Sequence, residues 1–257
     1  MGKLLGPPIG GWLLALAGPA WALGIDAASY LLPIASVMFL LRPNREAEQR
    51  SAAGERSTLL NAWHNCGTTL RGVLTLTAVL CVVNFFHPGL APLIAEQVLG
   101  PDPRDLGLFT SVLAAGSIAG GVLLQRNSAR FSNRPFLTLG GFGLVTALAQ
   151  LGMASEAGVG ISLAMAFLIG AGTAGLLSSC NLITQIGSAQ VMRVRMAGLS
   201  QIAFLGGGGL SGLLAALMVM ATSLSTTFAI TGGIGAALAL LWMHQRGSRT
   251  LEPVRSA

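Results

Sequence analysis

The sequence predicts an all-α protein, a helical bundle that crosses a membrane about eight times, since its apolar stretches are each close to the roughly 20 residues of a spanning helix. Of the 257 residues, 53% are hydrophobic and only 9% are charged. An average soluble domain carries about a quarter charged residues. A chain in hydrocarbon must satisfy its backbone hydrogen bonds internally, which favours helices, and the stretches are too long for barrel strands.

Hydropathy fixes the predicted crossings in order. They are Leu4–Ala17, Ala20–Leu41, Val73–Leu93, Leu106–Leu124, Phe136–Ala154, Val159–Leu182, Met196–Ala221 and Ser223–Met243. The first also has features of a cleaved signal peptide, because a short apolar run follows Lys3. Pro7 and Pro8 interrupt that run and another membrane segment follows it, so we interpret it as a crossing.

The charges between the crossings predict the orientation. If the crossings alternate in direction, fourteen of the fifteen Lys and Arg residues fall on one side, and only Arg104 falls on the other. This is the positive-inside pattern, so both termini are predicted to be cytoplasmic. The net charge of +6 is spread over separate loops, which argues for topology and against a nucleic-acid partner.

Residues 42–70 form the one long polar connection. Its first part, up to Arg56, is predicted to be a solvated linker. From Leu59 onward, Leu59, Trp63, Cys66 and Leu70 recur at helical spacing, which predicts an amphipathic helix at the membrane interface, with Trp63 at headgroup level. The alternative is a simple lead-in to the next crossing.

Glycines at small-xxx-small spacing predict close helix packing. Gly170-x-Gly172-x-x-Gly175 matches the dinucleotide-binding fingerprint as a string, but it lacks the preceding strand and the later acidic residue. We therefore interpret these glycines, like Gly116 and Gly120, as packing positions. The same holds for the run Gly206 to Gly209 with Gly212, which also makes its helix easy to bend.

The opening of the chain carries a more specific pattern. Gly2, Gly6 and Gly10 lie on one helix face, Pro7 bends the helix, and Gly11 follows. With these offsets the segment resembles the fifth-helix antiporter motif of the major facilitator superfamily. In that family the fifth helix packs against the eighth, so the resemblance implies that Gly6 meets Gly116 and Gly120.

Two further segments resemble the same superfamily. Residues 18–43 are similar to the sixth helix of the efflux branch that includes enterobactin exporters and macrolide efflux proteins. The turn at Arg193 and Arg195 resembles the cytoplasmic turn between the tenth and eleventh helices, without the acids that usually precede its first arginine. The loop at 125–134 holds the place of the conserved basic loop of the second half, with a degenerate pattern.

This register implies a domain order. Residues 1–41 would be the last two helices of the first half, 42–70 a cytoplasmic linker, 71–244 a complete six-helix second half and 245–257 a cytoplasmic tail. About the first four helices of the family fold would be missing from this chain, as far as the resemblance goes. They would be supplied in trans, or the chain is incomplete and inactive alone.

The resemblance implies proton-coupled efflux of small amphipathic compounds by two halves that rock around a midplane site. The expected location is the cytoplasmic membrane of a bacterium, in contact with lipid, with an unidentified small-molecule substrate and protons as partners. The alternative is a membrane scaffold, or the membrane subunit of a larger assembly, that transports nothing.

Polar residues inside the crossings are the candidate transport-path or coupling residues, because burying them in lipid is costly. Asp26 is the only acid well within a crossing, where it would carry a proton or orient the outer mouth. Asn84 and His87 are predicted to be neighbours on one helix face, where they line a polar cavity or make interhelical hydrogen bonds. Nearer the cytoplasmic ends, and more typical of structural roles, are Asn181, Gln185 and Gln201.

The sequence carries no pattern typical of an enzyme. It has no nucleophile with a base, no paired carboxylates and no metal-ligand spacing, and His64, His87 and His244 are far apart. The three widely spaced cysteines are predicted to be free thiols. We therefore expect no catalysis, no cofactor and no metal.

Overall fold

The computed structural model describes residues 24, 27–29, 31–40, 59–189, 192–248 and 250. The antiporter-like motif, Asp26 and most of the predicted linker lie outside these residues. The described part of the chain is helical and contains no strand. The prediction of an all-α polytopic bundle is confirmed.

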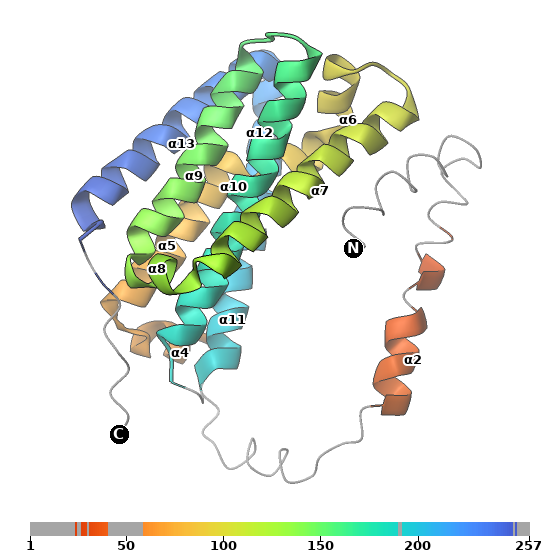
Figure 1. The fold of residues 1–257 in the computed structure, drawn as a ribbon. Coiled ribbons are helices and arrows are strands. Elements are labelled where there is room, and N and C mark those ends of the chain that lie inside the picture. Colours follow the sequence, from red (N-terminus) through yellow and green to blue (C-terminus); the bar gives the residue numbers. More distant parts are fainter. Residues whose placement is uncertain are drawn as a thin grey trace.

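Six spans in the described residues are long and apolar enough to cross a membrane, and they pack side by side (Figure 1). Each matches a predicted crossing. The helices that build them are α5 (Gly67–Asn84) with α6 (His87–Val98), α7 (Pro103–Arg126), α9 (Pro135–Ala154), α10 (Val159–Ile186), α11 (Arg193–Gln201) with α12 (Gly207–Ala221), and α13 (Leu224–Arg246). Shorter helices are α2 (Leu31–Leu40), inside the second predicted crossing, α4 (Leu59–Asn65) and α8 (Ser128–Asn133).

Helix α10 packs closely against both α7 and α9. A Cβ atom added at Gly170 would overlap the carbonyl of Leu113 on α7, and one at Gly172 or Gly175 would overlap Thr146 or Phe142 on α9. The string that resembles a dinucleotide fingerprint therefore lies inside a helix and serves helix packing, as predicted. Because glycine has no side chain, the helices can approach each other closely at these positions.

Gly116 and Gly120 on α7 form the other side of this contact. A Cβ atom at either glycine would overlap a backbone carbonyl of α10, that of Phe167 or Ala171. Their packing role is confirmed. The expected partner is wrong, because the small face of α7 is already filled by α10 and is not open to Gly6, which itself lies outside the described residues.

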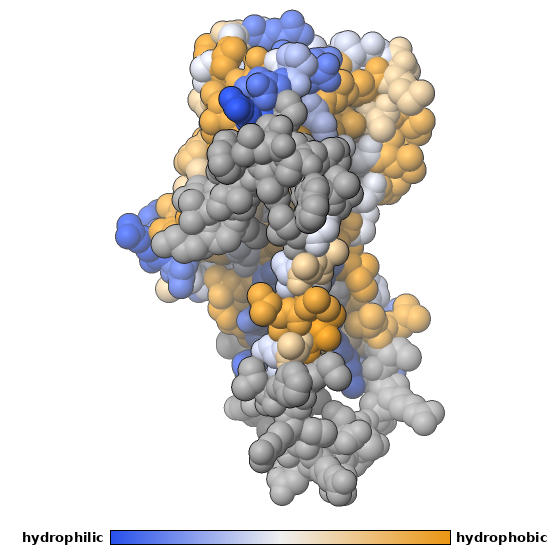
Figure 2. Space-filling model, turned by 90° about the vertical axis from the view of Figure 1, so that its right-hand side faces the viewer, coloured by the Kyte–Doolittle hydropathy of each residue, from blue (hydrophilic) through white to orange (hydrophobic). Residues whose placement is uncertain are grey.

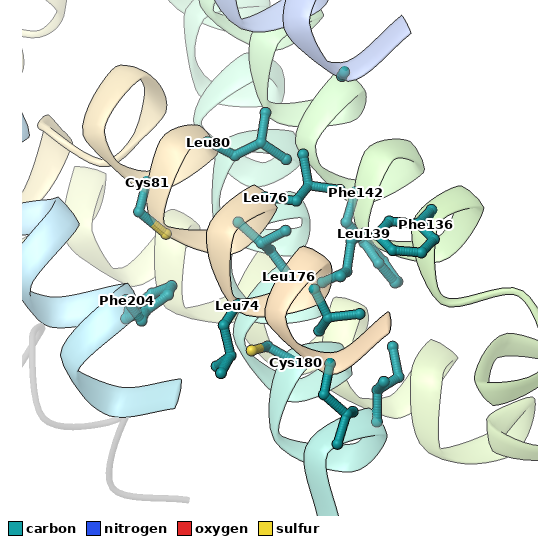
Figure 3. Close-up of a cluster of buried hydrophobic side chains, with 14 of the residues drawn as sticks. Leu74, Leu76, Leu80, Cys81, Phe136, Leu139, Phe142, Leu176, Cys180 and Phe204 are labelled. Carbon is teal, nitrogen blue, oxygen red and sulfur yellow. The ribbon is translucent and has the colours of Figure 1, made fainter. Parts of the chain in front are cut away.

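The buried side chains form two clusters. One is centred on α5, α9 and α10 and reaches Phe204, which lies between α11 and α12 (Figure 3). The other lies nearer the end of the bundle that carries the α6–α7 turn, around Phe86, Phe109, Ile169 and Phe228. Cys66, Cys81 and Cys180 are free, as predicted, and all three are buried.

Two spans are interrupted near their middles. The crossing predicted as one helix over Val73–Leu93 is two helices, because Phe85 has φ −106° and ψ 31° and Pro88 stands at the start of α6. Proline has no N–H to continue the hydrogen-bond ladder. Between α11 and α12 lies the π-helical turn η2 (Ile202–Gly206), which ends at the first glycine of the run that was predicted to ease bending.

The predicted amphipathic helix is also divided. Helix α4 ends at Asn65, and Gly67 has φ +65°, a conformation that favours glycine. Cys66 and Leu70 are buried and Trp63 packs against the same core, whereas Leu59 is 43% exposed. Burial raises the pKa of the Cys66 thiol, which donates a hydrogen bond to the carbonyl of Trp63 at 3.1 Å. The apolar face is confirmed except at Leu59, and its place at the interface stays a prediction.

The two ends of the bundle differ in charge. The described acids, Glu96, Asp102, Asp105 and Glu156, lie in or beside the α6–α7 and α9–α10 turns. Figure 2 shows hydrophobic surface along the side of the bundle, with hydrophilic residues gathered at the upper end, where the α6–α7 turn lies in Figure 1. The opposite end carries α4, α8 with Arg130, and the start of α11 with Arg193 and Arg195.

We predict opposite effects for two adjacent glycines of α7. Gly120→Ala should destabilise the protein by about 1–3 kcal/mol, because the new methyl group meets the α10 backbone. Gly121→Ala should stabilise it by up to about 1 kcal/mol through helix propensity, because nothing lies within 4 Å of that position. Thermal unfolding in detergent measures both. Equal shifts would contradict the backbone contact.

The charge distribution also predicts the topology. In a background with the native cysteines replaced, Pro101→Cys should react with a membrane-impermeant maleimide on intact cells, and Asn133→Cys should react only after permeabilisation. Both positions are exposed, so accessibility to solvent does not separate them. Labelling of position 133 on intact cells would show that the orientation is the reverse of the predicted one.

Candidate functional site

The break between α5 and α6 brings buried polar groups to the middle of the bundle. Asn84 ends α5, Phe85 and Phe86 form the break, and His87 begins α6. Asn84 and His87 are 2% and 6% exposed. A break of this kind frees backbone groups that the surrounding protein must satisfy, because lipid offers them no partner.

Gln150 of α9 provides that partner on one side. Its Nε2 donates a hydrogen bond to the backbone carbonyl of Asn84 at 2.8 Å, and the side chain is wholly buried. The side chain of Asn84 lies against Gly235 of α13, where a Cβ atom would overlap it. Asn84 thus faces the contact between α9 and α13.

His87 faces a cavity of about 350 Å³ on another side of the break. The side chains that line it come from the break, α7, α10 and the π-helical turn: Phe85, His87, Pro88, Ser117, Ile118, Thr173, Ala174, Leu177, Ser178 and Phe204. Asn84 does not line it. The prediction that Asn84 and His87 share one helix face is therefore wrong, because the helix stops between them.

Aromatic rings connect the break to the π-helical turn. The Phe85 ring stands edge-on to the His87 ring, with centroids 5.1 Å apart, and its centroid lies 4.4 Å from that of Phe204. Gly208, just beyond the π-helical turn, leaves room for Phe85. The two irregular segments thus meet at one wall of the cavity.

Several polar atoms around the break have no hydrogen-bond partner among the described residues. They are both side-chain polar atoms of Asn84, Nδ1 of His87 and Oε1 of Gln150. A buried polar atom without a partner costs about 1–3 kcal/mol. Of these three residues only His87 lines the cavity, so its Nδ1 can bond to a ligand or accept a proton without losing an existing hydrogen bond.

The other predicted candidates are more peripheral. Asn181 accepts a hydrogen bond from Ser200 at 2.5 Å, which joins α10 to α11. Gln185 and Gln201 are exposed. Arg193 is exposed and Arg195 is half-buried, both in the first turn of α11 at the arginine-rich end. The antiporter-like glycines and Pro7, together with Asp26, lie outside the described residues.

Sequence reasoning missed Gln150 and Phe204. Gln150 is the only strongly polar residue inside an otherwise apolar crossing, and that was the available signal. Phe204 carries no comparable signal, because one aromatic residue in an apolar run is ordinary. In the part of the chain that the structure describes, no three His, Cys, Asp or Glu side chains gather as metal ligands.

A protein-family comparison covers almost the whole chain. The family model MFS_3, described as transmembrane secretion effector, matches residues 1–253. No curated protein matches the sequence.

We predict that Gln150→Leu destabilises the protein by about 1–3 kcal/mol, because it leaves the Asn84 carbonyl buried without its donor. Gln125→Leu, at an exposed position near the end of α7, should change stability by less than about 0.5 kcal/mol. Melting temperatures of the two variants in the same detergent give the comparison. A similar shift for both would show that the hydrogen bond adds nothing to stability.

Proposed function

The chain belongs to the MFS_3 family of transmembrane secretion effectors, in the major facilitator superfamily of membrane transporters, and from that premise we propose that it exports small amphipathic compounds in exchange for protons. The observation that carries the proposal is the cavity beside the helix break. It combines aromatic and aliphatic walls with a few polar groups, the usual make-up of a small-molecule site.

The cavity suits a compound with an apolar body and one polar or charged group. Phe85, Phe204 and Leu177 offer apolar contact, and Ser117, Thr173 and Ser178 offer hydroxyls. The hydroxyl of Thr173 already donates to the carbonyl of Ile169 at 2.8 Å, but its oxygen can still accept. A site with so few fixed polar partners favours a class of compounds over a single one.

The two irregular segments support a cycle of alternating access. Helices broken near the bilayer midplane are frequent at transporter binding sites, where one bundle rocks against another. In this proposal α5–α6 and α11–α12 change their bend together, because Phe85 and Phe204 are in contact. Residues 1–41 would belong to the first half of the transporter and 71–244 to the second.

Proton coupling needs a titratable group in the membrane interior. The described acids all lie at or near the outer turns. Within the spans this leaves His87 in the described part of the chain, and Asp26 outside it. We propose that one of these two side chains carries the proton. The similarity of the opening glycine motif to antiporters favours exchange over uniport.

We predict that inside-out membrane vesicles take up a fluorescent amphipathic cation when the lumen is acidic, if they come from cells that express the chain together with the first four helices of the family fold in trans. Asp26→Asn and His87→Gln should each be tested. The variant that removes the proton carrier should lower gradient-driven uptake about tenfold, a typical size for coupling between two sites, yet still exchange dye for dye. His64→Gln, at an exposed position of α4, is the matched control.

Three outcomes contradict the proposal in different ways. If uptake by the unmodified protein does not depend on the pH gradient, the proposal of proton coupling is wrong. If uptake by both variants remains fully coupled to the pH gradient, neither Asp26 nor His87 carries the proton. If the protein is folded and inserted but takes up none of several chemically different amphipathic dyes, the proposed export function is wrong.

A further inference from the structure

A second cavity lies at the arginine-rich end of the bundle, away from the transport cavity. It has a volume of about 490 Å³ and is lined by Arg130, Phe131, Asn133, Arg134, Leu137 and Thr138. These residues belong to α8, the turn after it and the first turns of α9. Nothing in the transport proposal uses them.

The turn that carries the two arginines is held in place by the core. The Phe131 ring packs against Phe142, with centroids 6.0 Å apart. The hydroxyl of Thr138 donates to the carbonyls of Phe131 at 2.7 Å and of Arg134 at 3.1 Å. These contacts fix the backbone from which Arg130 and Arg134 project, so the cavity wall is pre-organised.

The charge of the cavity is not balanced within the described residues. Arg130 and Arg134 form no ion pair there, and the four described acids lie at the other end of the bundle. Arg246, which stacks over Phe136 and Trp242, adds a third cation near this end. A guanidinium group binds phosphate through two parallel hydrogen bonds, which suits it to an anionic oxygen ligand.

The depth of the cavity matches that of lipid headgroups. On α7, Val122 and Leu123 are 41% and 51% exposed, as expected for residues that face acyl chains. Arg126 follows three residues later, about 4.5 Å further along the axis at 1.5 Å per residue. The cavity just beyond it therefore lies where basic pockets at cytoplasmic helix ends meet anionic headgroups.

We propose that this cavity binds a phosphate group, supplied by the headgroup of an anionic phospholipid of the cytoplasmic leaflet. Arg130 and Arg134 hold the phosphate oxygens, and the exposed apolar residues of α7 contact the acyl chains. The bound lipid would anchor the α8 turn to the membrane surface. The same chemistry could come from soluble phosphate, which the test separates.

The test measures lipid binding to the detergent-purified chain by native mass spectrometry, with phosphatidylglycerol, phosphatidylcholine and inorganic phosphate as probes. Phosphatidylglycerol should bind more tightly than phosphatidylcholine. The double variant Arg130→Gln/Arg134→Gln should weaken phosphatidylglycerol binding about tenfold or more, because the charge-assisted hydrogen bonds are lost. Arg134→Lys should lose less, since it keeps the charge but not the fork.

Arg193→Gln is the matched control, an exposed arginine at the same end that does not line the cavity. It should leave binding unchanged. Melting curves in phosphatidylcholine nanodiscs verify that each variant is folded. Displacement of phosphatidylglycerol by inorganic phosphate, at the affinity of phosphate alone, assigns the site to soluble phosphate and overturns the lipid assignment. Equal phosphatidylglycerol binding by the folded double variant and the unmodified chain overturns the site.

Discussion

The hydrogen bond from Gln150 to the carbonyl of Asn84 is the interaction on which the centre of the bundle depends. In hydrocarbon a helix cannot be interrupted unless another group takes over the freed backbone atoms. Gln150 does so from α9, and this lets α5 end and α6 begin in a new direction. Without that donor, the break that directs His87 towards the cavity would leave a bare carbonyl in a medium of low dielectric.

The glycine contacts solve the complementary problem of holding the bundle together. Lipid chains are as apolar as leucine, so burial from water does not drive these helices together. Gly170 on α10 and Gly120 on α7 bring two backbones into direct contact, where dispersion forces act over many atoms. With α10 fixed between α7 and α9, the interrupted spans among the described residues are α5–α6 and α11–α12, which also border the cavity.

The sequence allowed the spans to be predicted because length and charge placement are set by the bilayer. The break at Phe85 was not predicted, although Pro88 was visible, because proline at the start of a helix and proline inside one look alike in a sequence. The spacing of Gly116 and Gly120 identified a packing face but not its partner, since glycine carries no side chain that specifies what it meets. The cavity wall at Phe204 depends on tertiary packing alone. Family resemblance placed the chain in its superfamily, but it could not identify Gln150.

The π-helical turn at Ile202–Gly206 has a consequence for how this region tolerates insertions and deletions. A π turn holds one more residue than an α turn, so it rotates everything on one side of it by about 100° relative to a continuous α-helix. Deleting a single residue within the turn would restore regular winding at little local cost. Because the turn already absorbs the extra residue, this deletion would leave Ser200 facing Asn181 and Gly208 facing Phe85, whereas a deletion in the regular part of α12 would rotate everything beyond it by about 100°. The loss of one residue is therefore tolerated better at this turn than in the regular helices on either side of it.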